Sequence, residues 1–330
     1  MKQVAGMLGK PTRWCATALM GVGVLFGAQA AAQNFPAKLV TVVVPYPAGG
    51  ATDVMARLLS ERLSQVWGHP VVVNNRPGAG GSVGGAVVAR APGDGYTLFA
   101  TTAAHTISAS LYKNLPFDPI KDFAPISLMA AMPLVLLTTP SLPVKTLPEL
   151  ISYLRAQPGA IFGSQGIGTP NHLSGELFKA QNKLAFLHVP YKGDSPLLSD
   201  LVGGHVQMGF LTITATLPYS RSGRLNPIAL AHPKRIDAIG EVPTFAEAGM
   251  AGFTAGTWIG LLGPASMSGE LQNRIYQDVS KIVANPEFTR KLIEFGAVVI
   301  NSSPQAFQAF VQSESQRWKE AVRLSGAQAE

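Results

Sequence analysis

Apolar and polar residues along the chain form repeated units of a β-branched run, a glycine-containing turn and a stretch with helical spacing. The first unit has an apolar run at 38–45, a Pro-Gly turn and helix-spaced apolar residues at 53–67. A short strand at 70–73, a small-residue helix at 84–90 and a strand at 96–101 follow. This alternation predicts an α/β fold with a mostly parallel sheet and flanking helices.

The pattern starts again at Pro133, which predicts a second α/β lobe. Strands are expected at 134–138, 160–164, 185–189, 206–211 and 227–231, and helices at 147–156, 170–181, 196–201 and 215–222. Thr146 is placed to cap the first of these helices. Three amphipathic helices within 269–324 then need an apolar surface to cover.

The C-terminal helices find such a surface if the chain returns to the first lobe. We therefore expect a discontinuous lobe 1 made of residues 33–133 plus 254–330, and a lobe 2 made of residues 134–253. Two crossovers would then join the lobes, which is the geometry of a hinge around an interlobe cleft.

The N-terminus has the order of a secretory signal peptide. Three basic residues, Lys2, Lys10 and Arg13, precede an uncharged apolar run of fifteen residues, and small residues follow at cleavage spacing. We expect a signal peptide over 1–32, cleaved near Ala32, and an exported protein. The apolar run is shorter than the ~20 residues of a bilayer span, although a retained N-terminal anchor is the alternative.

Composition narrows the class of protein further. The chain has 330 residues, of which 47% are hydrophobic and 14% charged, with a net charge of +7 and one cysteine, Cys15. Removal of 1–32 takes away that cysteine and three basic residues, which leaves a net charge of +4. Disulfide scaffolds are excluded. The histidines lack metal-ligand spacing, and basic patches interleaved with aromatic residues are missing. We expect no metal, no cofactor and no nucleic-acid partner.

The turn before the helix at 53–67 has the chemistry of an anion site. Gly49 and Gly50 let a ligand approach the backbone, and the helix start presents unpaired N–H groups that suit a carboxylate. Thr52 can add its hydroxyl, whereas Asp53 would repel an anion and is better suited to brace the turn. The alternative is an ordinary strand-to-helix turn with an Asp cap.

A second turn of this kind lies in lobe 2. Ser164, Gln165 and Thr169 supply neutral hydrogen-bonding groups beside another helix start. Two opposed turns of this type suit a ligand with two carboxylates. His172 fits a ligand contact or a helix-packing histidine equally well.

Two further groups of residues are candidates for chemistry. Thr101, Thr102 and His105 follow the C-terminal end of a strand, where open α/β sheets place their ligands. Ser82 lies in a Gly-x-Ser-x-Gly sequence, but a Pro-Gly loop separates it from the preceding strand, unlike a nucleophile elbow. An exported hydrolase that uses Ser82 is therefore the less favoured alternative.

Several ordered motifs over the whole mature chain are specific enough to indicate a family. The chain resembles the substrate-binding receptors of tripartite tricarboxylate transporters, also called the Bug family, in PYPAGGATDVMARLLSERL, VVVNNRPGAGGSVGG, GSQGIGTPNHLSGE, VPYKGDSP, LVGGHVQMGF and VPTFAEAG. The resemblance implies a two-lobed type 2 periplasmic binding protein that acts as a monomer. It would capture a small organic carboxylate and deliver it to the membrane permease. A sensor that presents the ligand to a membrane signalling receptor is the alternative, and the family implies no enzyme activity.

The resemblance also implies which residues bind the ligand, because family ligands are held by main-chain amides, Ser and Thr hydroxyls and ordered waters. The matching positions are Ala48, Gly49, Thr52 and Asp53 in the first-lobe loop and Ser164, Gln165, Thr169 and His172 in the second.

One departure from the family pattern bears on specificity. Many relatives carry Asp followed by Asn or Ser after the strand in LVGGHVQMGF, whereas this chain has Leu211 and Thr212. An Asp there would pair with a ligand ammonium group, and its absence leaves Leu211 or Thr212 to face the ligand. We therefore expect a carboxylate without a positive group, such as a di- or tricarboxylate or an aromatic acid.

Overall fold

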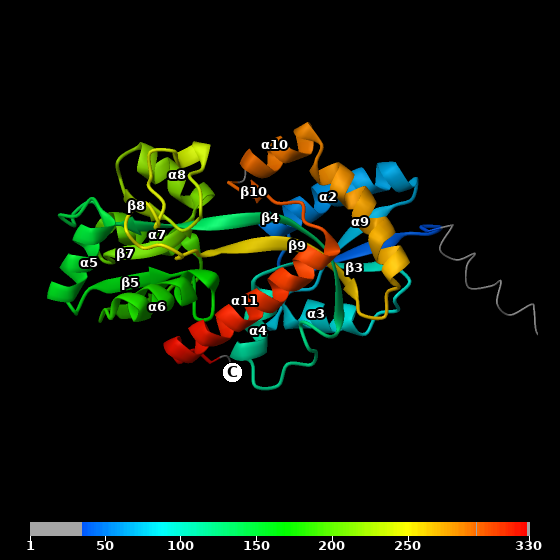
Figure 1. Cartoon of the computed structure of the whole chain (residues 1–330), viewed down its shortest axis with the longest axis horizontal. Helices are drawn as coiled ribbons and strands as arrows, with labels where there is room; N and C mark the ends of the chain where they lie inside the picture. The colour runs from blue at the N-terminus through cyan, green and yellow to red at the C-terminus, as the bar shows by residue number, and fades with distance from the viewer. Residues whose placement is uncertain (1–34, 295, 329–330) are drawn as a thin grey trace, which may run out of the picture.

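Two α/β lobes lie side by side along the long axis of the molecule in a computed structural model that describes residues 35–294 and 296–328 (Figure 1). Two long strands, β4 (Phe123–Thr138) and β9 (Gly256–Pro264), run in the region where the lobes meet. The signal peptide expected at 1–32 lies outside the described residues.

Lobe 1 contains the N-terminal elements and the C-terminal helices. Its strands, besides β9 and the first part of β4, are β1 (Val40–Val44), β2 (Val71–Asn75), β3 (Thr97–Thr102) and β10 (Val298–Val299). Its helices are α2 (Ala51–Trp67), η1 (Ala79–Gly81), α3 (Ser82–Ala89), α4 (Ala104–Leu111), α9 (Gly269–Val283), α10 (Pro286–Glu294) and α11 (Pro304–Ser325).

Lobe 2 contains the elements between β4 and β9. Its strands are β5 (Ile161–Ser164), β6 (Leu187–Pro190), β7 (Met208–Thr212) and β8 (Asn226–Leu230), and its helices are α5 (Leu147–Ala156), α6 (Pro170–Asn182), α7 (Asp194–Gly203), α8 (Ile213–Arg221) and η2 (Asp237–Ile239). Thr146 caps α5 as predicted, because its hydroxyl accepts from the Glu149 N–H while the Glu149 carboxylate accepts from the Thr146 N–H.

The sheet is mixed, and the prediction of a mostly parallel sheet is wrong at its centre. The strand order is β2-β1-β3-β9-β4-β7-β5-β6, and β8 and β10 also pair with β4. The outer pairs β1–β2, β1–β3, β5–β6 and β5–β7 are parallel, whereas every pairing of β4 or β9 is antiparallel. The reason is topological: β4 carries the chain into lobe 2 and β9 carries it back, so these neighbours run in opposite directions.

The strand pattern missed the first part of β4, all of β9 and helix α4. Strand β4 is buried along almost its whole length, so it lacks the apolar and polar alternation by which a half-exposed strand is recognised. It also continues through Pro133, where the pattern predicted a new start. The N-terminal part of β4 pairs with β9, and the part from Leu134 onward pairs with β7 and β8.

The C-terminal helices cover apolar surface on lobe 1, and α11 also reaches lobe 2. Ile275 and Val279 of α9 lie in one core with β1, β3 and α2. Phe307 and Trp318 of α11 share a second core with Trp258 of β9 and with Leu173, which belongs to α6 of lobe 2. Figure 1 shows α11 running obliquely across the front toward lobe 2. This helix therefore ties the two lobes together beside the strands.

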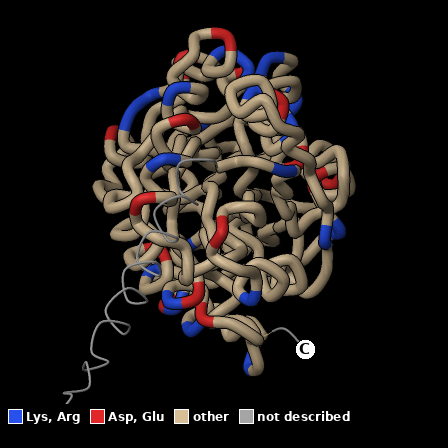
Figure 2. The backbone as a smooth tube through the Cα atoms, turned by 90° about the vertical axis from the view of Figure 1, so that its right-hand side faces the viewer, with Lys and Arg blue, Asp and Glu red and all other residues tan. Residues whose placement is uncertain are grey.

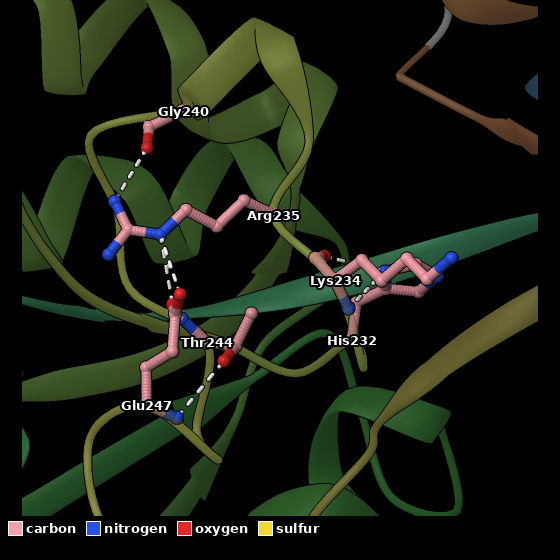
Figure 3. A network of polar contacts seen from close by, with 6 residues as sticks. All are labelled: His232, Lys234, Arg235, Gly240, Thr244 and Glu247. Carbon is pink, nitrogen blue, oxygen red and sulfur yellow. Dashed lines mark hydrogen bonds and ion pairs between the residues drawn. The ribbon is translucent and has the colours of Figure 1, made fainter.

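The long loop between β8 and β9 is held by a polar network (Figure 3). Arg235 Nε donates to both carboxylate oxygens of Glu247 at 2.9 and 3.0 Å, and its Nη1 donates to the Gly240 carbonyl. Glu247 in turn accepts from the Thr244 N–H at 2.8 Å. Phe245 between them is fully buried in the lobe 2 core. The VPTFAEAG motif thus has a structural role, since it closes this core.

Charged residues of both signs intermingle over the molecule (Figure 2). Within residues 35–294 and 296–328, no helix is long and apolar enough to cross a membrane. In the same part of the chain, no group of three or more His, Cys, Asp or Glu residues is arranged to hold a metal ion.

Gly256 of β9 lies opposite Pro133 of β4, and its replacement tests how closely the two strands approach there. An added Cβ would lie 2.8 Å from the Met132 carbonyl oxygen and 3.1 Å from Pro133 Cα. Both are backbone atoms, so we expect Gly256→Ala to lower the free energy of unfolding by about 1–3 kcal/mol in urea titrations. Gly269→Ala at the start of α9 is the matched control, because its Cβ meets nothing within 4 Å. Equal stability of the two variants would contradict the close approach.

Candidate functional site

A cavity of about 630 Å³ lies between the lobes, and both lobes line it. We call it the interlobe cavity. Its polar lining residues are Tyr46, Thr52, Thr102, Ser108, Tyr112, Gln165, Thr169, Asn171, Asp194, Thr212, Thr214 and Thr257. Its larger apolar residues are Ile107, Leu111, Met132, Leu134, Ile167 and Pro170. Among the described residues that line it, none is a Lys, Arg or His. The volume and the mixed lining suit a small organic molecule.

Five helices begin at the interlobe cavity, one of them α7 with its first residue, Asp194. Ala51 and Thr52 of α2, Ala104 of α4, Pro170 and Asn171 of α6, and Ala215 of α8 are lining residues within the first turns. Each helix start has unpaired N–H groups and carries roughly half a positive charge from its dipole. These helix starts favour an anion without a cationic side chain, while the Asp194 carboxyl is the acidic group among the described lining residues.

The helix starts differ in whether the side chain of the N-cap residue caps them, and α7 of lobe 2, whose N-cap is Gly193, has no such cap. In lobe 2, the Thr169 hydroxyl accepts from the N–H of His172 in α6, and the Thr212 hydroxyl accepts from the N–H of Ala215 in α8. In lobe 1, the N-cap residues of α2 and α4 are Gly50 and Ala103, and neither helix has a side-chain cap. At α4, however, the N–H of Ala104 donates to Thr102 Oγ1 at 3.4 Å. Of the two lobe 1 helices, α2 therefore has the start that is more available to water or a ligand.

Asp53 braces the loop before α2 rather than facing the cavity. Its carboxylate is 2% exposed and accepts from the Gly49 N–H at 2.8 Å, from Arg57 Nε at 2.9 Å and from Asn75 Nδ2 at 2.8 Å. Burial disfavours the charged form, but these hydrogen bonds and the Arg57 charge outweigh it and lower the pKa of the Asp53 carboxyl to about 2. The carboxylate stays ionised and holds the start of α2 in place.

Two stacked histidines support the loop before α6. His172 Nδ1 accepts from the Gly168 N–H at 3.1 Å, His188 Nε2 lies 2.7 Å from Ser164 Oγ, and the two rings stack with centroids 3.9 Å apart. Burial lowers the pKa of His172 to about 3 and that of His188 to about 4, with the neighbouring His188 adding to the effect on His172. Neutral rings let His172 accept from Gly168, which lines the cavity.

The structure brings some of the residues expected in the site to the interlobe cavity and leaves others outside its lining. Thr52, Thr102, Gln165, Thr169 and Thr212 line it. The other residues of the two loops, which are not among the lining residues, are Ala48, Gly49, Gly50, Asp53, Ser164 and His172. Of these, Ala48, Gly49 and Gly50 are exposed, and the rest are buried.

Thr101, His105 and Leu211 are buried away from the cavity lining. His105 Nε2 lies 2.9 Å from the Pro119 carbonyl, and its ring packs among Phe99, Phe117 and Phe123. Leu211 belongs to the lobe 2 core.

Ser82, the residue on which a hydrolase would depend, is the first residue of α3. Its hydroxyl donates to the Ala79 carbonyl at 2.8 Å, and it is not among the residues that line the interlobe cavity. The contact is that of a residue that stabilises the glycine-rich turn before α3.

Several lining residues were missed by reasoning from the sequence, above all Asp194. It begins α7 directly after a strand and a glycine turn, the same signal that led to the two loops named above, but the helix was expected only from 196. Met132 and Thr257 were missed because they lie on the first part of β4 and on β9, which the strand pattern did not predict. Tyr112 and Ile107 belong to the α4 region, which carried no clear pattern.

Comparison with known proteins identifies the family. The family model described as "Tripartite tricarboxylate transporter family receptor" matches residues 55–326. The chain belongs to this family. Members of the tripartite tricarboxylate transporter receptor family bind a substrate as receptors rather than transform it. The protein BugT of Bordetella pertussis is 34% identical over 303 residues, which are 91% of this chain and 93% of BugT.

Solved structures of the receptor family share the fold. The R. palustris protein Rpa4515 with adipate is 35% identical with a TM-score of 0.76, and the match covers 88% of this chain and 98% of that protein. MatC from Rhodopseudomonas palustris with bound malate is 32% identical with a TM-score of 0.73, covering 87% and 100%. The prediction of a two-lobed α/β binding-protein fold of this family is therefore confirmed.

His105 makes the stability of the fold depend on pH. Burial lowers the pKa of His105 to about 4, below the ~6.5 of an exposed histidine. Between pH 6.5 and pH 4, His105 is therefore protonated in the unfolded chain and neutral in the folded one. The free energy of unfolding that this group contributes above pH 6.5 is lost as the pH falls toward 4. At pH 5 we expect this single group to cost about 2 kcal/mol.

The measurement compares the free energy of unfolding in urea at pH 7.5 and pH 5. His105→Gln should reduce the difference between the two values, whereas His205→Gln at an exposed position should leave it as in the unchanged protein. An unaltered difference in His105→Gln would mean that His105 titrates normally in the folded state.

Proposed function

We propose that this protein is a periplasmic solute-binding receptor that captures a small organic carboxylate in the interlobe cavity and delivers it to a tripartite tricarboxylate-type permease. The observation that carries the proposal is the convergence of five helix starts on a cavity whose polar lining, apart from Asp194, consists of neutral hydrogen-bonding groups. Adipate and malate, which occupy the related structures, are carboxylates of the size that this cavity suits.

The ligand carboxylate is best accommodated at the lobe 1 side of the cavity. There the uncapped start of α2 offers main-chain N–H groups, and the Thr52 hydroxyl lies beside them. The start of α4 lies next to it, where Thr102 Oγ1 accepts from the Ala104 N–H and is hydrogen-bonded to the Tyr46 hydroxyl. Ile107 and Leu134 offer apolar surface to the hydrocarbon part of the ligand. Such a site binds the anion through oriented donors, so that no cationic side chain is required.

We infer that the two lobes close on the ligand by rotation about the strands β4 and β9, which connect them. Lobe 1 is made of residues 33–133 plus 254–330, and lobe 2 of residues 134–253. The support is that β4 changes partners after Pro133, and that the Leu134 N–H donates to the Ala255 carbonyl at 3.0 Å where the chain returns. A ligand that contacts both lobes binds the closed form more tightly and so shifts the population toward it.

The proposed location follows from the N-terminal sequence. The signal peptide expected to end near Ala32 would export the chain to the periplasm. A thermal-shift screen of aliphatic and aromatic carboxylates on protein refolded without ligand, followed by calorimetry, tests the proposal, because a ligand of the folded state raises its stability.

A pair of substitutions at Ala51 tests whether the start of α2 binds the carboxylate. Ala51→Asp places a negative charge in the cavity, where Coulomb repulsion should weaken binding of the carboxylate at least about tenfold by calorimetry. Ala51→Asn is nearly the same shape without the charge and should change affinity only a few-fold. An acidic residue in a first helical turn does not destabilise the helix, so both variants should fold. Equal affinities would place the carboxylate elsewhere.

A further inference from the structure

Asp194 is the acidic residue in a cavity that should bind an anion. It is the first residue of α7 and reaches the interlobe cavity from lobe 2, while the starts of α2 and α4 reach it from lobe 1. Among the residues that line the cavity, no cationic side chain offsets its charge. A carboxylate in this position repels any anionic group placed near it. Its presence in the lining therefore needs an explanation, and a contact with a donor group of the ligand would supply one.

One oxygen of Asp194 is held and the other is available. Asp194 Oδ1 accepts from Gln165 Nε2, and Gln165 also lines the cavity. Within residues 35–294 and 296–328, Asp194 has no ion-pair partner and Oδ2 makes no hydrogen bond. Burial raises the pKa of the Asp194 carboxyl, and only the hydrogen bond from Gln165 opposes this effect. Asp194 is partly buried and lines the cavity, so the free oxygen can accept a hydrogen bond from a donor that enters the cavity.

We infer that Asp194 is a specificity-determining residue that accepts a hydrogen bond from a hydroxyl or ammonium group of the ligand, at the end away from the ligand carboxylate. The inference rests on the proposed function, because it assumes that the carboxylate lies at α2 and α4. The ligand class it names is a monocarboxylate with a distal donor group. A second carboxylate at that end would meet the negative charge of Asp194, so dicarboxylates should bind more weakly.

Asp194 alters the expectation, drawn from Leu211 and Thr212, that the ligand carries no positive group. Leu211 and Thr212 occupy the position where an acidic residue would contact an ammonium group, and Leu211 is in fact buried in the core. Asp194 reaches the cavity from a different element and supplies the acceptor that the strand end lacks. A positive group on the ligand is therefore compatible with the cavity after all.

The test uses sets of matched acids of three to eight carbons, each set an unsubstituted monocarboxylate, its ω-hydroxy and ω-amino forms and the dicarboxylate. For six carbons these are hexanoate, 6-hydroxyhexanoate, 6-aminohexanoate and hexanedioate. Calorimetry at pH 8 on ligand-free refolded protein should show at least tenfold tighter binding of a hydroxy or amino acid than of its unsubstituted and dicarboxylate counterparts. The hydroxy and amino forms separate the two sources of the donor.

Asp194→Asn keeps the shape of the side chain and removes its charge. We expect it to weaken binding of the preferred acid at least tenfold and to strengthen binding of the matching dicarboxylate, while Asp237→Asn, an exposed change of the same charge in lobe 2, leaves both unchanged. The same ranking of acids in Asp194→Asn as in the unchanged protein would overturn the inference and leave the proposed function standing. No binding of any carboxylate in the sets or in the wider screen would overturn both.

Discussion

Antiparallel pairing between β4 and β9 places side by side the two segments by which the chain leaves lobe 1 and returns to it, and both strands contribute residues to the interlobe cavity. The ladder runs from Phe123 opposite Pro264 to Pro133 opposite Gly256, and alternate residues face opposite sides of it. Thr257 lines the cavity, whereas the next residue, Trp258, packs against Phe307 of α11. The same strands therefore line the interlobe cavity on one face and contact the core under α11 on the other. Any relative motion of the lobes has to be absorbed where this ladder ends.

The interlobe cavity has no Lys, Arg or His among the described residues that line it, and this bears on how the proposed receptor would release its ligand. A Lys or Arg in a cavity of this kind would hold a carboxylate strongly, whereas helix starts and hydroxyls distribute the interaction over several weaker donors. The helix starts and hydroxyls that line the cavity belong to both lobes. Ligand capture, as proposed, therefore depends on how the two lobes are placed relative to each other.

Buried polar groups that do not line the cavity keep those donors in place. Asp53 joins the loop before α2 to Asn75 at the end of β2, and His172 joins the loop before α6 to its own helix. Asp53 stays ionised because its hydrogen bonds lower the pKa of its carboxyl in spite of burial, and His172 stays neutral because burial lowers its pKa. Residues that resemble ligand-binding groups in the sequence can thus act one layer behind the ligand.

Local patterns in the sequence determined the two glycine turns, the helices that start after them, the cap of α5 and the amphipathic C-terminal helices, because each depends on residues a few positions apart. The directions of β4 and β9 had no such signature, since their pairing joins residues more than 120 positions apart in the chain. Tertiary structure also decided which side chains face the cavity. Thr52 lines it and Asp53 is buried beside it, because successive residues of a helix point in directions about 100° apart. Only the folding of lobe 2 against lobe 1 brought Asp194 to the same cavity as the starts of α2 and α4, since these segments approach each other across the lobe boundary and not along the chain.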